Sequence, residues 1–363
     1  MMRILIATDA WRPQVNGVVR SLESVAESAK ELGAEIDFLT PRDFHSFPMP
    51  TYREISLALA TPRAVRRRLD TGYDHIHIAT EGPIGLAARA VCLRDKRVFT
   101  TSFHTRFPEY IRARTGLPVA LSYAALRRFH NAGSGVMVST PSLAQELDAR
   151  GFRRLLRWSR GVDHGVFNPD ARIALDLPRP IFLYAGRLAV EKNLEAFLAL
   201  DLPGTKLVVG DGPARPSLEA RYPNATFVGV KTPVELAALY AASDVFVFPS
   251  RTDTFGIVLL EAMACGLPVA AYPVMGPLDV VGGSGAGILD EDLRAAALAA
   301  LDIPREAARA HALTFTWENC TRQFLDNIVY ARGAASLSGA GRETLKNSGE
   351  KREAVDKGQT VQP

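Results

Sequence analysis

The sequence predicts an α/β protein built from two doubly wound domains, each a parallel sheet with helices on both faces. Short apolar runs typical of buried strands alternate with helix-like segments along the chain. The alternation stops at a segment rich in Pro and Asp, residues 166–180, and then starts again. A length of 363 residues with 47% hydrophobic content is sufficient for two domains of ordinary size.

The first domain is expected over residues 1–165. It opens with an apolar run at 4–8, followed by a polar loop and an amphipathic helix at about 18–32 that Gly33 ends. The later strand-like runs, each followed by a loop and a helix-like segment, are at residues 36–39, 75–79, 97–101 and 136–139.

The second domain is expected over residues 181–312, after a linker at 166–180. Its strand-like runs are at residues 181–185, 206–209, 225–228, 245–248 and 268–271. We expect residues 313–332 to form a helix that crosses back to the first domain, and the polar residues 333–363 to form a disordered tail. Parallel sheets bind ligands at the carboxyl ends of their strands, so two facing domains predict a cleft for two substrates.

Charge is distributed unevenly along the chain. Residues 1–160 contain 24 Lys and Arg against 15 Asp and Glu, a net charge of +9, whereas the remainder contains 19 against 24, a net charge of −5. A positive half attracts anionic surfaces such as phospholipid headgroups, nucleic acid or acidic sugars. Solvated arginine-rich faces explain the same excess and remain the alternative.

The sequence indicates neither export nor a membrane span. The start of the chain shows no basic-then-apolar leader, and no stretch approaches 18 apolar residues, so we expect a cytoplasmic protein with at most peripheral membrane contact. The three cysteines, Cys92, Cys265 and Cys320, lack CxxC spacing and are expected to be packing thiols.

Two further patterns are superficially similar to metal sites. His75 and His77 share one face of a strand but have no evident third ligand. Asp290 and Asp292 precede an alanine-rich helix, as capping residues do. We therefore expect no metal site.

Polar loops follow the strands of the second domain. Gly186, Arg187 and Lys192 come after the strand-like run at 181–185. A guanidinium binds two phosphate oxygens and an ammonium adds a point charge, so the pair matches a diphosphate without a metal ion. A solvated loop is the alternative.

Two other strands of this domain end in glycine. Gly210 ends one strand-like run in a tight turn, where the backbone can approach a ligand or simply reverse. Val230 and Lys231 follow Gly229 after the next run, where main-chain groups can reach the edge of a base.

The stretch SRTDTFGIVLLEAMACGLPVA, residues 250–270, contains two carboxylates around a helix start. That start, formed by Thr254, Phe255, Gly256 and Ile257, offers free N–H groups and the positive end of a helix dipole to an anion. Glu261 has apolar neighbours on both sides, and a buried carboxylate needs partners, which ribose hydroxyls would supply. Asp253 either contacts a ligand or only caps the helix.

In the first domain, two loops after strands carry polar groups. Asn16 and Gly17 stand at a helix start, where the glycine would let the backbone approach phosphates from the opposite domain. The loop after the run at 97–101 carries His104, Arg106, Glu109 and Tyr110. A plain loop-to-helix transition and a structural histidine are the alternatives.

Taken together, these motifs resemble the retaining glycosyltransferases of family 4, with the GT-B fold of two Rossmann-like domains facing each other across a cleft. The resemblance rests on Arg187 with Lys192 and on the Gly-Asp-Gly-Pro turn at 210–213. It also rests on Asp253, eight residues before Glu261, and on the Gly-x-Pro sequence at 266–268 that ends the helix of Glu261. It also includes Asn16-Gly17 and the segments 103–107 and 160–163, and covers about residues 2–330.

The resemblance implies roles for individual residues. Glu261 would hold the nucleotide ribose, Asp253 the transferred sugar, Arg187 and Lys192 the diphosphate, and His104 would face the donor sugar and the acceptor hydroxyl. Arg106, Glu109 and Tyr110 are expected on the acceptor side. The family's first acid is commonly glutamate, so the shorter Asp253 makes the sugar contact and the identity of the sugar open questions.

The implied reaction transfers a hexose-type sugar from a UDP-linked donor to a hydroxyl with retention, without a metal or other cofactor. The segments at 103–118 and 250–264 look most like the branch of sulfoquinovosyl, glucosyl and mannosyl diacylglycerol transferases. We therefore expect a lipid acceptor and peripheral contact with the inner face of the cell membrane, aided by the positive first half and an apolar run at 119–126 before Arg127 and Arg128.

The sequence is compatible with two other functions. The same transfer to a soluble acceptor or polysaccharide keeps all the residue roles. A non-catalytic nucleotide-sugar-binding protein belongs to a different class. A dinucleotide oxidoreductase is disfavoured because no GxGxxG follows the first strand. No nucleic-acid partner is expected.

Overall fold

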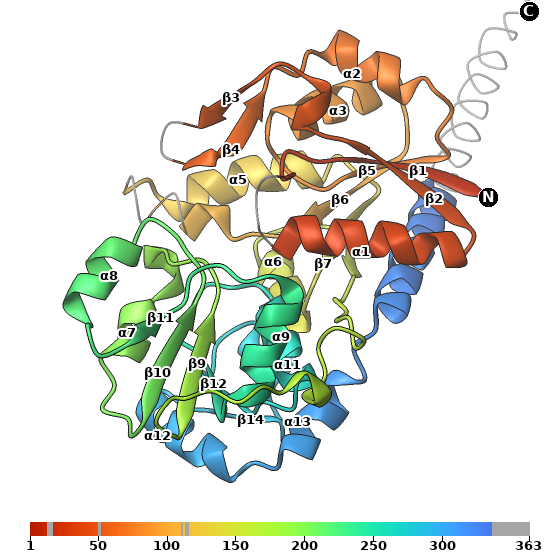
Figure 1. Ribbon diagram of the computed structural model, residues 1–363. Coiled ribbons are helices and arrows are strands. Elements are labelled where there is room, and N and C mark those ends of the chain that lie inside the picture. The colour runs from red at the N-terminus through yellow and green to blue at the C-terminus, as the bar shows by residue number, and fades with distance from the viewer. Residues whose placement is uncertain (13–16, 50–51, 110–111, 113–115, 336–363) are drawn as a thin grey trace, which may run out of the picture.

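The computed structural model describes residues 1–12, 17–49, 52–109, 112 and 116–335. It contains two domains, each centred on a six-stranded parallel sheet, and they lie one above the other in Figure 1. The predicted fold class is therefore confirmed. Asn16, Tyr110 and residues 336–363 of the expected tail lie outside the described residues, whereas residues 333–335, expected in that tail, are helical.

The sheet of the first domain has the strand order β2-β1-β5-β6-β7-β8. Its strands are β1 (Met2–Ala7), β2 (Ala34–Leu39), β5 (His75–Ile78), β6 (Phe99–Phe103), β7 (Gly135–Val138) and β8 (Leu155–Arg157). The helical segments are α1 (Gly17–Glu31), η1 (Pro41–Asp43), α2 (Pro62–Leu69), α3 (Pro83–Arg94), α5 (Val119–His130) and α6 (Pro141–Ala149). An antiparallel hairpin of β3 (Ser46–Met49) and β4 (Tyr52–Ala58), which the sequence analysis did not predict, is added to this domain.

Alternation along β1 explains how both faces of this sheet are covered. Ile4 and Ile6 belong to a buried cluster with α1 and with the helix at residues 317–335. Leu5 and Ala7 point to the other face and belong to a cluster with α2 and α3. The helix at the C-terminal end of the described chain therefore packs on the sheet of the first domain, as Figure 1 shows beside α1.

The sheet of the second domain has the order β11-β10-β9-β12-β13-β14, again parallel throughout. Its strands are β9 (Ile181–Ala185), β10 (Thr205–Val209), β11 (Thr226–Phe227), β12 (Val245–Phe248), β13 (Val269–Ala271) and β14 (Gly287–Leu289). The helices are α7 (Leu194–Leu198), α8 (Arg215–Arg221), α9 (Pro233–Ala242), α10 (Ile257–Ala264), α11 (Pro277–Val280), α12 (Leu293–Ala299) and α13 (Arg305–Ala312). Short 3-10 turns are η2 (Pro169–Ala171), η3 (Val190–Lys192) and η4 (Ala300–Asp302).

The same alternation divides the core of the second domain. Ile181 and Leu183 of β9 pack in a cluster with α9, α10 and α13. Phe182 and Tyr184 pack on the opposite face with α7, α8 and α12. Helices thus cover both faces of each sheet. Polar side chains can be presented to a ligand from the loops at the carboxyl ends of the strands.

The carboxyl ends of the two sheets face each other. Thr254, in the loop after β12, donates through Oγ1 to the carbonyl oxygen of His104, just after β6, at 2.8 Å. Ser139, just after β7, donates through Oγ to the Thr254 carbonyl oxygen at 3.3 Å. At the start of α6, the backbone N–H and Oγ of Ser142 both donate to Asp279 Oδ1 of α11, at 3.1 and 3.0 Å. These contacts bring the loops predicted to bind ligands into one interdomain region.

Candidate active site

Three glycine-containing loops lie side by side at the carboxyl edge of the second sheet. The Gly186 N–H donates to the Val209 carbonyl, and the Gly210 N–H donates to the Gly229 carbonyl at 2.9 Å. Gly210 has φ +131, and a Cβ there would lie 2.0 Å from the Gly186 carbonyl oxygen, so only glycine permits this contact. The structure therefore brings together the loops of Gly186, Gly210 and Val230 with Lys231, which the sequence analysis assigned to the donor.

Lys192 and Asp253 form an ion pair between the loop after β9 and the loop after β12. Lys192 Nζ lies 2.5 Å from Asp253 Oδ1, and both side chains are about one-fifth exposed. The loops are also joined by Asn193 Nδ2, which donates to the Pro249 carbonyl, and by Thr252 Oγ1, which donates to the Glu191 carbonyl. Asp253 Oδ2 is buried and has no hydrogen-bond partner among the described residues. The pair thus holds a positive charge and a carboxylate oxygen next to each other in the cleft.

Arg187 follows β9 on the same edge. Its carbonyl oxygen accepts a hydrogen bond from the Tyr184 hydroxyl at 3.0 Å, and its residue is partly exposed. Burial raises the pKa of Tyr184, so this hydroxyl stays a donor and supports the turn. Arg187 and Lys192 thus belong to the same connection after β9, where the sequence analysis expects two cations for a diphosphate.

Glu261 lies on α10, whose start is at Gly256 in a left-handed conformation with φ +83. Glu261 is 1% exposed, and burial raises the pKa of its carboxyl group while Arg20 opposes that rise. Glu261 Oε1 lies 2.6 Å from Arg20 Nη1 of α1, and Tyr240 Oη lies at 3.5 Å from Oε2. A buried carboxylate needs such partners because its desolvation costs several kcal/mol.

Arg20 is a site residue that the sequence analysis missed. It comes from the opposite domain and lines, with Glu261, Phe167 and Ile257, a cavity of about 180 Å³. Its guanidinium also lies over the ring of Phe167, at 5.7 Å from the centroid. The sequence indicates Arg20 only by its position three residues after Gly17. Its partner Glu261 is in the other domain, so the ion pair has no local sequence pattern.

The starts of α1 and α10 meet at this cavity. A Cβ on Gly17 would lie 3.3 Å from Cδ1 of Ile257, so the first turns of the two helices are in contact. The positive dipole ends of both helices therefore point to one region, which favours an anionic ligand. Thr254 and Phe255 belong to the loop that leads into α10, and Phe255 is buried.

His104 lies on the first-domain side of the cleft. Its Nδ1 lies 3.0 Å from Arg160 Nη2, and its Nε2 is buried without a hydrogen-bond partner among the described residues. Burial, and after it the charge of Arg160, lowers the pKa of His104 well below its usual range. The His104 carbonyl oxygen accepts a hydrogen bond from Thr254, the residue after Asp253, so the backbone of His104 lies beside the Asp253 loop across the cleft.

Arg106 and Glu109, expected on the acceptor side, bind each other and two helices of their own domain. Arg106 Nη2 lies 3.1 Å from Oε1 of both Glu109 and Glu146, and the Tyr123 hydroxyl donates to Glu109 Oε1 at 2.9 Å. Burial, followed by Glu109 and Glu146, raises the pKa of Tyr123. This network fastens the loop after β6 to α5 and α6.

The patterns that were set aside as structural are found in structural positions. His75 and His77 hydrogen-bond to Thr100 and Ser102 inside the first sheet. Asp292 caps α12, accepting from the N–H groups of Arg294 and Ala295, as predicted. All three cysteines are buried free thiols, which confirms their expected packing role. Within the described ranges, no three His, Cys, Asp or Glu side chains form a group that could hold a metal ion.

Two protein-family models match the chain. Residues 15–166 match a model described as Glycosyltransferase Family 4. Residues 179–303 match a model described as Glycosyl transferases group 1. Each match covers most of one sheet domain and includes the loops that meet in the cleft.

Relatives of known activity are similar over long stretches. The chain is 32% identical over 380 residues to a GDP-mannose-dependent alpha-mannosyltransferase of Mycolicibacterium smegmatis, covering 93% of this chain and 100% of the relative. It is 31% identical over 298 residues to the sulfoquinovosyl transferase of Arabidopsis thaliana, covering 74% of this chain and 58% of that relative. The chain thus spans little more than half the length of the Arabidopsis protein.

Solved structures share the two-domain architecture. A sucrose-phosphate synthase from Thermosynechococcus elongatus has a TM-score of 0.74 at 22% identity, covering 93% of this chain and 100% of that chain. HepE from Anabaena, in complex with UDP and glucose, has a TM-score of 0.68 at 16% identity, covering 91% and 100%. These similarities support the GT-B arrangement of the fold.

Proposed function

The chain belongs to the family 4 glycosyltransferases, and from that premise we propose that it moves a hexose from a nucleoside diphosphate sugar to a lipid hydroxyl with retention at the anomeric carbon. The observation that carries the proposal is the convergence of cations, a buried carboxylate and two helix starts in one interdomain cleft. The cations and the helix starts suit a diphosphate, and the buried carboxylate suits the hydroxyls of a ribose.

The proposed donor site assigns one task to each group. Arg187 and Lys192 neutralise the diphosphate, Glu261 accepts hydrogen bonds from ribose hydroxyls, and Asp253 accepts one from the sugar. The Lys192 ammonium is within 2.5 Å of Asp253 Oδ1, which supports a sugar and a phosphate lying next to each other at that point. No metal ion enters this proposal.

The proposed chemistry requires no protein nucleophile. The acceptor oxygen forms a bond to the anomeric carbon as the bond from that carbon to the diphosphate oxygen breaks. The acceptor proton passes to the leaving phosphate oxygen on the same face of the sugar. Fixed positive groups stabilise the charge that develops on the diphosphate, in the way that preorganised donors stabilise an oxyanion.

The donor nucleotide is proposed to be UDP, with GDP-mannose as a second candidate. The UDP proposal rests on the resemblance to the sulfoquinovosyl and glucosyl transferase branch. The GDP-mannose candidate is favoured by the mannosyltransferase relative that matches over its full length. The guanidinium, ammonium and ribose groups described above fit either nucleotide, so the donor must be measured.

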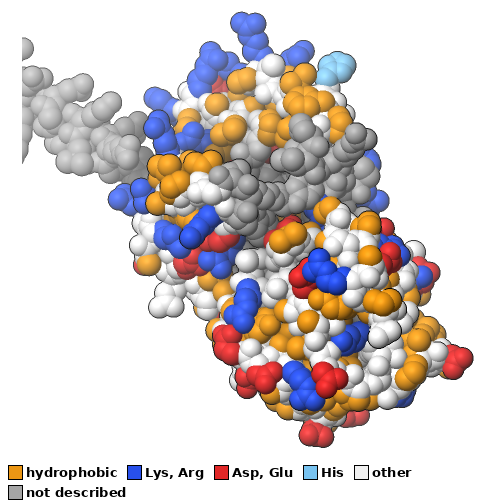
Figure 2. All heavy atoms as spheres, turned by 90° about the vertical axis from the view of Figure 1, so that its left-hand side faces the viewer, with side chains coloured by type: hydrophobic (Ala, Val, Ile, Leu, Met, Phe, Trp, Pro, Cys, Tyr) orange, Lys and Arg blue, Asp and Glu red, His pale blue; other side chains and the backbone are white. Residues whose placement is uncertain are grey.

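A lipid acceptor is supported by the surface of the first domain. Leu117, Leu121 and Phe107 are 46%, 62% and 44% exposed, and Arg127 and Arg128 on α5 are exposed as well. Figure 2 shows Lys and Arg side chains gathered over the first domain, whereas Asp and Glu appear mainly over the second. No helix among the described residues is long and apolar enough to cross a bilayer. We propose that this surface rests on an anionic membrane and that diacylglycerol is the acceptor.

A donor and acceptor panel tests the proposal. UDP-glucose, UDP-sulfoquinovose and GDP-mannose are each supplied with diacylglycerol in vesicles, with a soluble glycoside, or with no acceptor. We expect glycolipid product with one donor and an α-linkage that reports retention. Product formed only on the soluble acceptor supports the soluble alternative. Nucleotide-sugar binding without transfer or hydrolysis would identify a binding protein instead.

A further inference from the structure

Arg160 is a buried arginine whose side chain is held in one position. The residue is 6% exposed, and Nη1 donates to the carbonyl oxygens of Trp158 and Ser159, both at 2.7 Å. The guanidinium also lies over the indole ring of Trp158, at 4.5 Å from the centroid. With Nη1 fixed in this way, the planar guanidinium directs Nη2 to Nδ1 of His104, at 3.0 Å.

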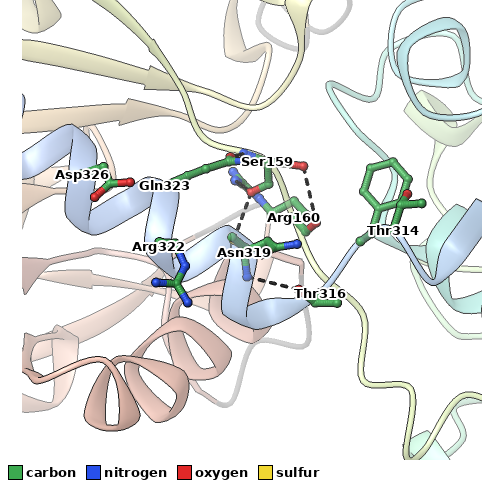
Figure 3. A pocket seen from close by; sticks show the side chains of 10 residues that line it. Ser159, Arg160, Thr314, Thr316, Asn319, Arg322, Gln323 and Asp326 are labelled. Atoms are coloured by element: carbon green, nitrogen blue, oxygen red, sulfur yellow. Dashed lines mark hydrogen bonds between the residues drawn. The ribbon is translucent and has the colours of Figure 1, made fainter.

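The backbone that carries Arg160 is fastened to the C-terminal helix. The Ser159 N–H donates to Gln323 Oε1 at 2.9 Å, and Cys320 Sγ donates to the Ser159 carbonyl oxygen at 3.1 Å. At Gly161 a Cβ would lie 2.4 Å from the Trp317 nitrogen, so the two segments touch. Figure 3 shows Arg160 at the wall of the resulting cavity of about 270 Å³, next to the helix that carries Asn319 and Gln323.

The contact with Arg160 determines which nitrogen of His104 carries a proton. A guanidinium has only N–H donors and no acceptor, so Nδ1 of His104 must accept the hydrogen bond. The remaining proton of the neutral ring is then on Nε2, the atom that is buried without a partner among the described residues. Within the described part of the chain, the charges that act on the ring are those of Arg160, His77 of β5 and His130 of α5, and none of these is a carboxylate. This environment opposes a second proton on the ring.

We infer that Arg160 is a positioning residue that fixes His104 as the tautomer with its proton on Nε2, so that His104 donates a hydrogen bond in the cleft and does not take the acceptor's proton. The recipient is an oxygen of the sugar or of the acceptor, a step that rests on the proposed function. The tautomer itself does not rest on it. The acceptor proton then has the leaving phosphate oxygen as its destination.

Nitrogen NMR on the full chain tests the tautomer without any substrate. With ¹⁵N-labelled histidine, and His104→Gln to assign the signals, we expect an unprotonated Nδ1 and a protonated Nε2 throughout pH 5.5 to 8.5. A proton on Nδ1, or titration of His104 within that range, would overturn the inference even if the enzyme transfers sugar as proposed.

Substitution of Arg160 tests its positioning role. Arg160→Met should give a mixture of tautomers or a His104 that titrates. Arg305→Met is the matched control, because Arg305 donates to three carbonyl oxygens where Arg160 donates to two, but lies in the second domain, and it should leave the His104 signals unchanged. Unchanged signals in Arg160→Met would rule out the role. If that variant does not fold, Arg160→Gln, whose amide can either donate or accept, is measured in the same way.

Two His104 variants then separate a donor at one ring position from a donor at the other. Gln places an amide N–H near the position of Nε2, whereas Asn places one near Nδ1. With the donor that the panel identifies, we expect His104→Gln to retain kcat within about 10-fold and His104→Asn to lose about 100-fold, as for loss of one oxyanion donor. Equal losses in both variants, or a pH limb of kcat/KM that disappears in both, would assign His104 as a base and contradict the inference.

Discussion

At the level of single residues, the two carboxylates of the proposed donor site are each paired with a cation from a distant part of the chain. Asp253 is paired with Lys192, and Glu261 with Arg20. The reason is energetic, because a carboxylate removed from water without a partner costs several kcal/mol. A ligand that uses these groups must exchange a protein contact for its own, so the net gain in binding is smaller than the sum of its contacts.

Substitution of the two cations at the end of β9 should slow turnover more than it weakens donor binding. We expect Arg187→Met or Lys192→Met to lower kcat by about 100-fold or more, because the positive charge acts on the leaving diphosphate. Steady-state kinetics with the donor that the panel identifies measure kcat and KM separately. Lys192→Met also leaves Asp253 unpaired, so the double variant Lys192→Met/Asp253→Asn is measured beside it.

Arg221→Met is the control for these variants. Arg221 is an exposed cation of the same domain that pairs with Glu195 on the outer helices, and its removal should change kcat less than 2-fold, as expected for a surface pair. A near-normal kcat in both Arg187→Met and Lys192→Met would contradict the assignment of the diphosphate site.

At the level of elements, β5 and β6 carry a buried polar ladder. Thr100 Oγ1 lies 2.9 Å from both His75 Nε2 and His77 Nδ1, and Ser102 Oγ lies 2.7 Å from His77 Nε2. Phe324 of the C-terminal helix packs edge-on against His77, with centroids 5.1 Å apart. The two alternating histidines therefore join β5 to the hydroxyl groups of β6, and His77 also packs against the C-terminal helix.

This ladder should make the protein sensitive to acid. Burial lowers the pKa of His75 to about 3 and lowers the pKa of His77 well below its usual range. Above pH 6.5 neither the folded nor the unfolded chain protonates these rings. As the pH falls below 6.5, only the unfolded chain takes up the protons, so stability falls by about 1.4 kcal/mol per pH unit for each histidine.

Urea unfolding at several pH values between 5 and 8 measures this loss. We expect the double variant His75→Gln/His77→Gln to be less stable at pH 8 but to show a flatter dependence on pH. His45→Gln, which replaces an exposed histidine, should keep the slope of the unaltered protein. An unchanged slope in the double variant would mean that other groups control the acid transition.

The exposed apolar and basic residues of α5 should control membrane contact. In flotation with vesicles of phosphatidylglycerol and phosphatidylcholine, we expect Leu121→Gln combined with Arg127→Gln and Arg128→Gln to reduce the bound fraction at least 3-fold, because both apolar burial and attraction to the anionic surface are lost. High salt should reduce binding of the unaltered protein. Absence of flotation at low salt would contradict the proposed membrane surface.

At the level of the whole molecule, the chain passes between the domains twice. It leaves the first domain after β8, and it returns after α13 to form the helix at 317–335 that packs on the first sheet. Arg309 of α13 also donates to the carbonyl oxygens of Phe167 and Ala264 beside the first crossing. The two crossings are in contact, because a Cβ on Gly161 would lie 2.4 Å from the Trp317 nitrogen.

Removal of Arg20 should alter both stability and nucleotide binding. We expect Arg20→Gln to lower the free energy of unfolding by about 1 to 3 kcal/mol, because Glu261 loses a charged partner. Arg20→Gln/Glu261→Gln should recover part of that loss, which a double-mutant cycle measures. Calorimetric titration with UDP and GDP should show altered affinity in Arg20→Gln, because the ribose hydroxyls no longer have to replace Arg20 as the partner of Glu261. Additive effects and unchanged affinities would contradict a role for this pair in the cleft.

The sequence by itself determined the fold class and the loops that approach the cleft, because strand alternation, glycine at strand ends and apolar neighbours of Glu261 are local features. It did not reveal β8, β14 or the β3–β4 hairpin, since strands of a few residues carry little periodic signal. Only the tertiary structure decided which charges meet. Lys192 and Asp253 are 61 residues apart, His104 and Arg160 are 56 apart, and Arg20 and Glu261 are on different domains. Such pairs depend on how two sheets face each other, and that geometry has no local pattern in the chain.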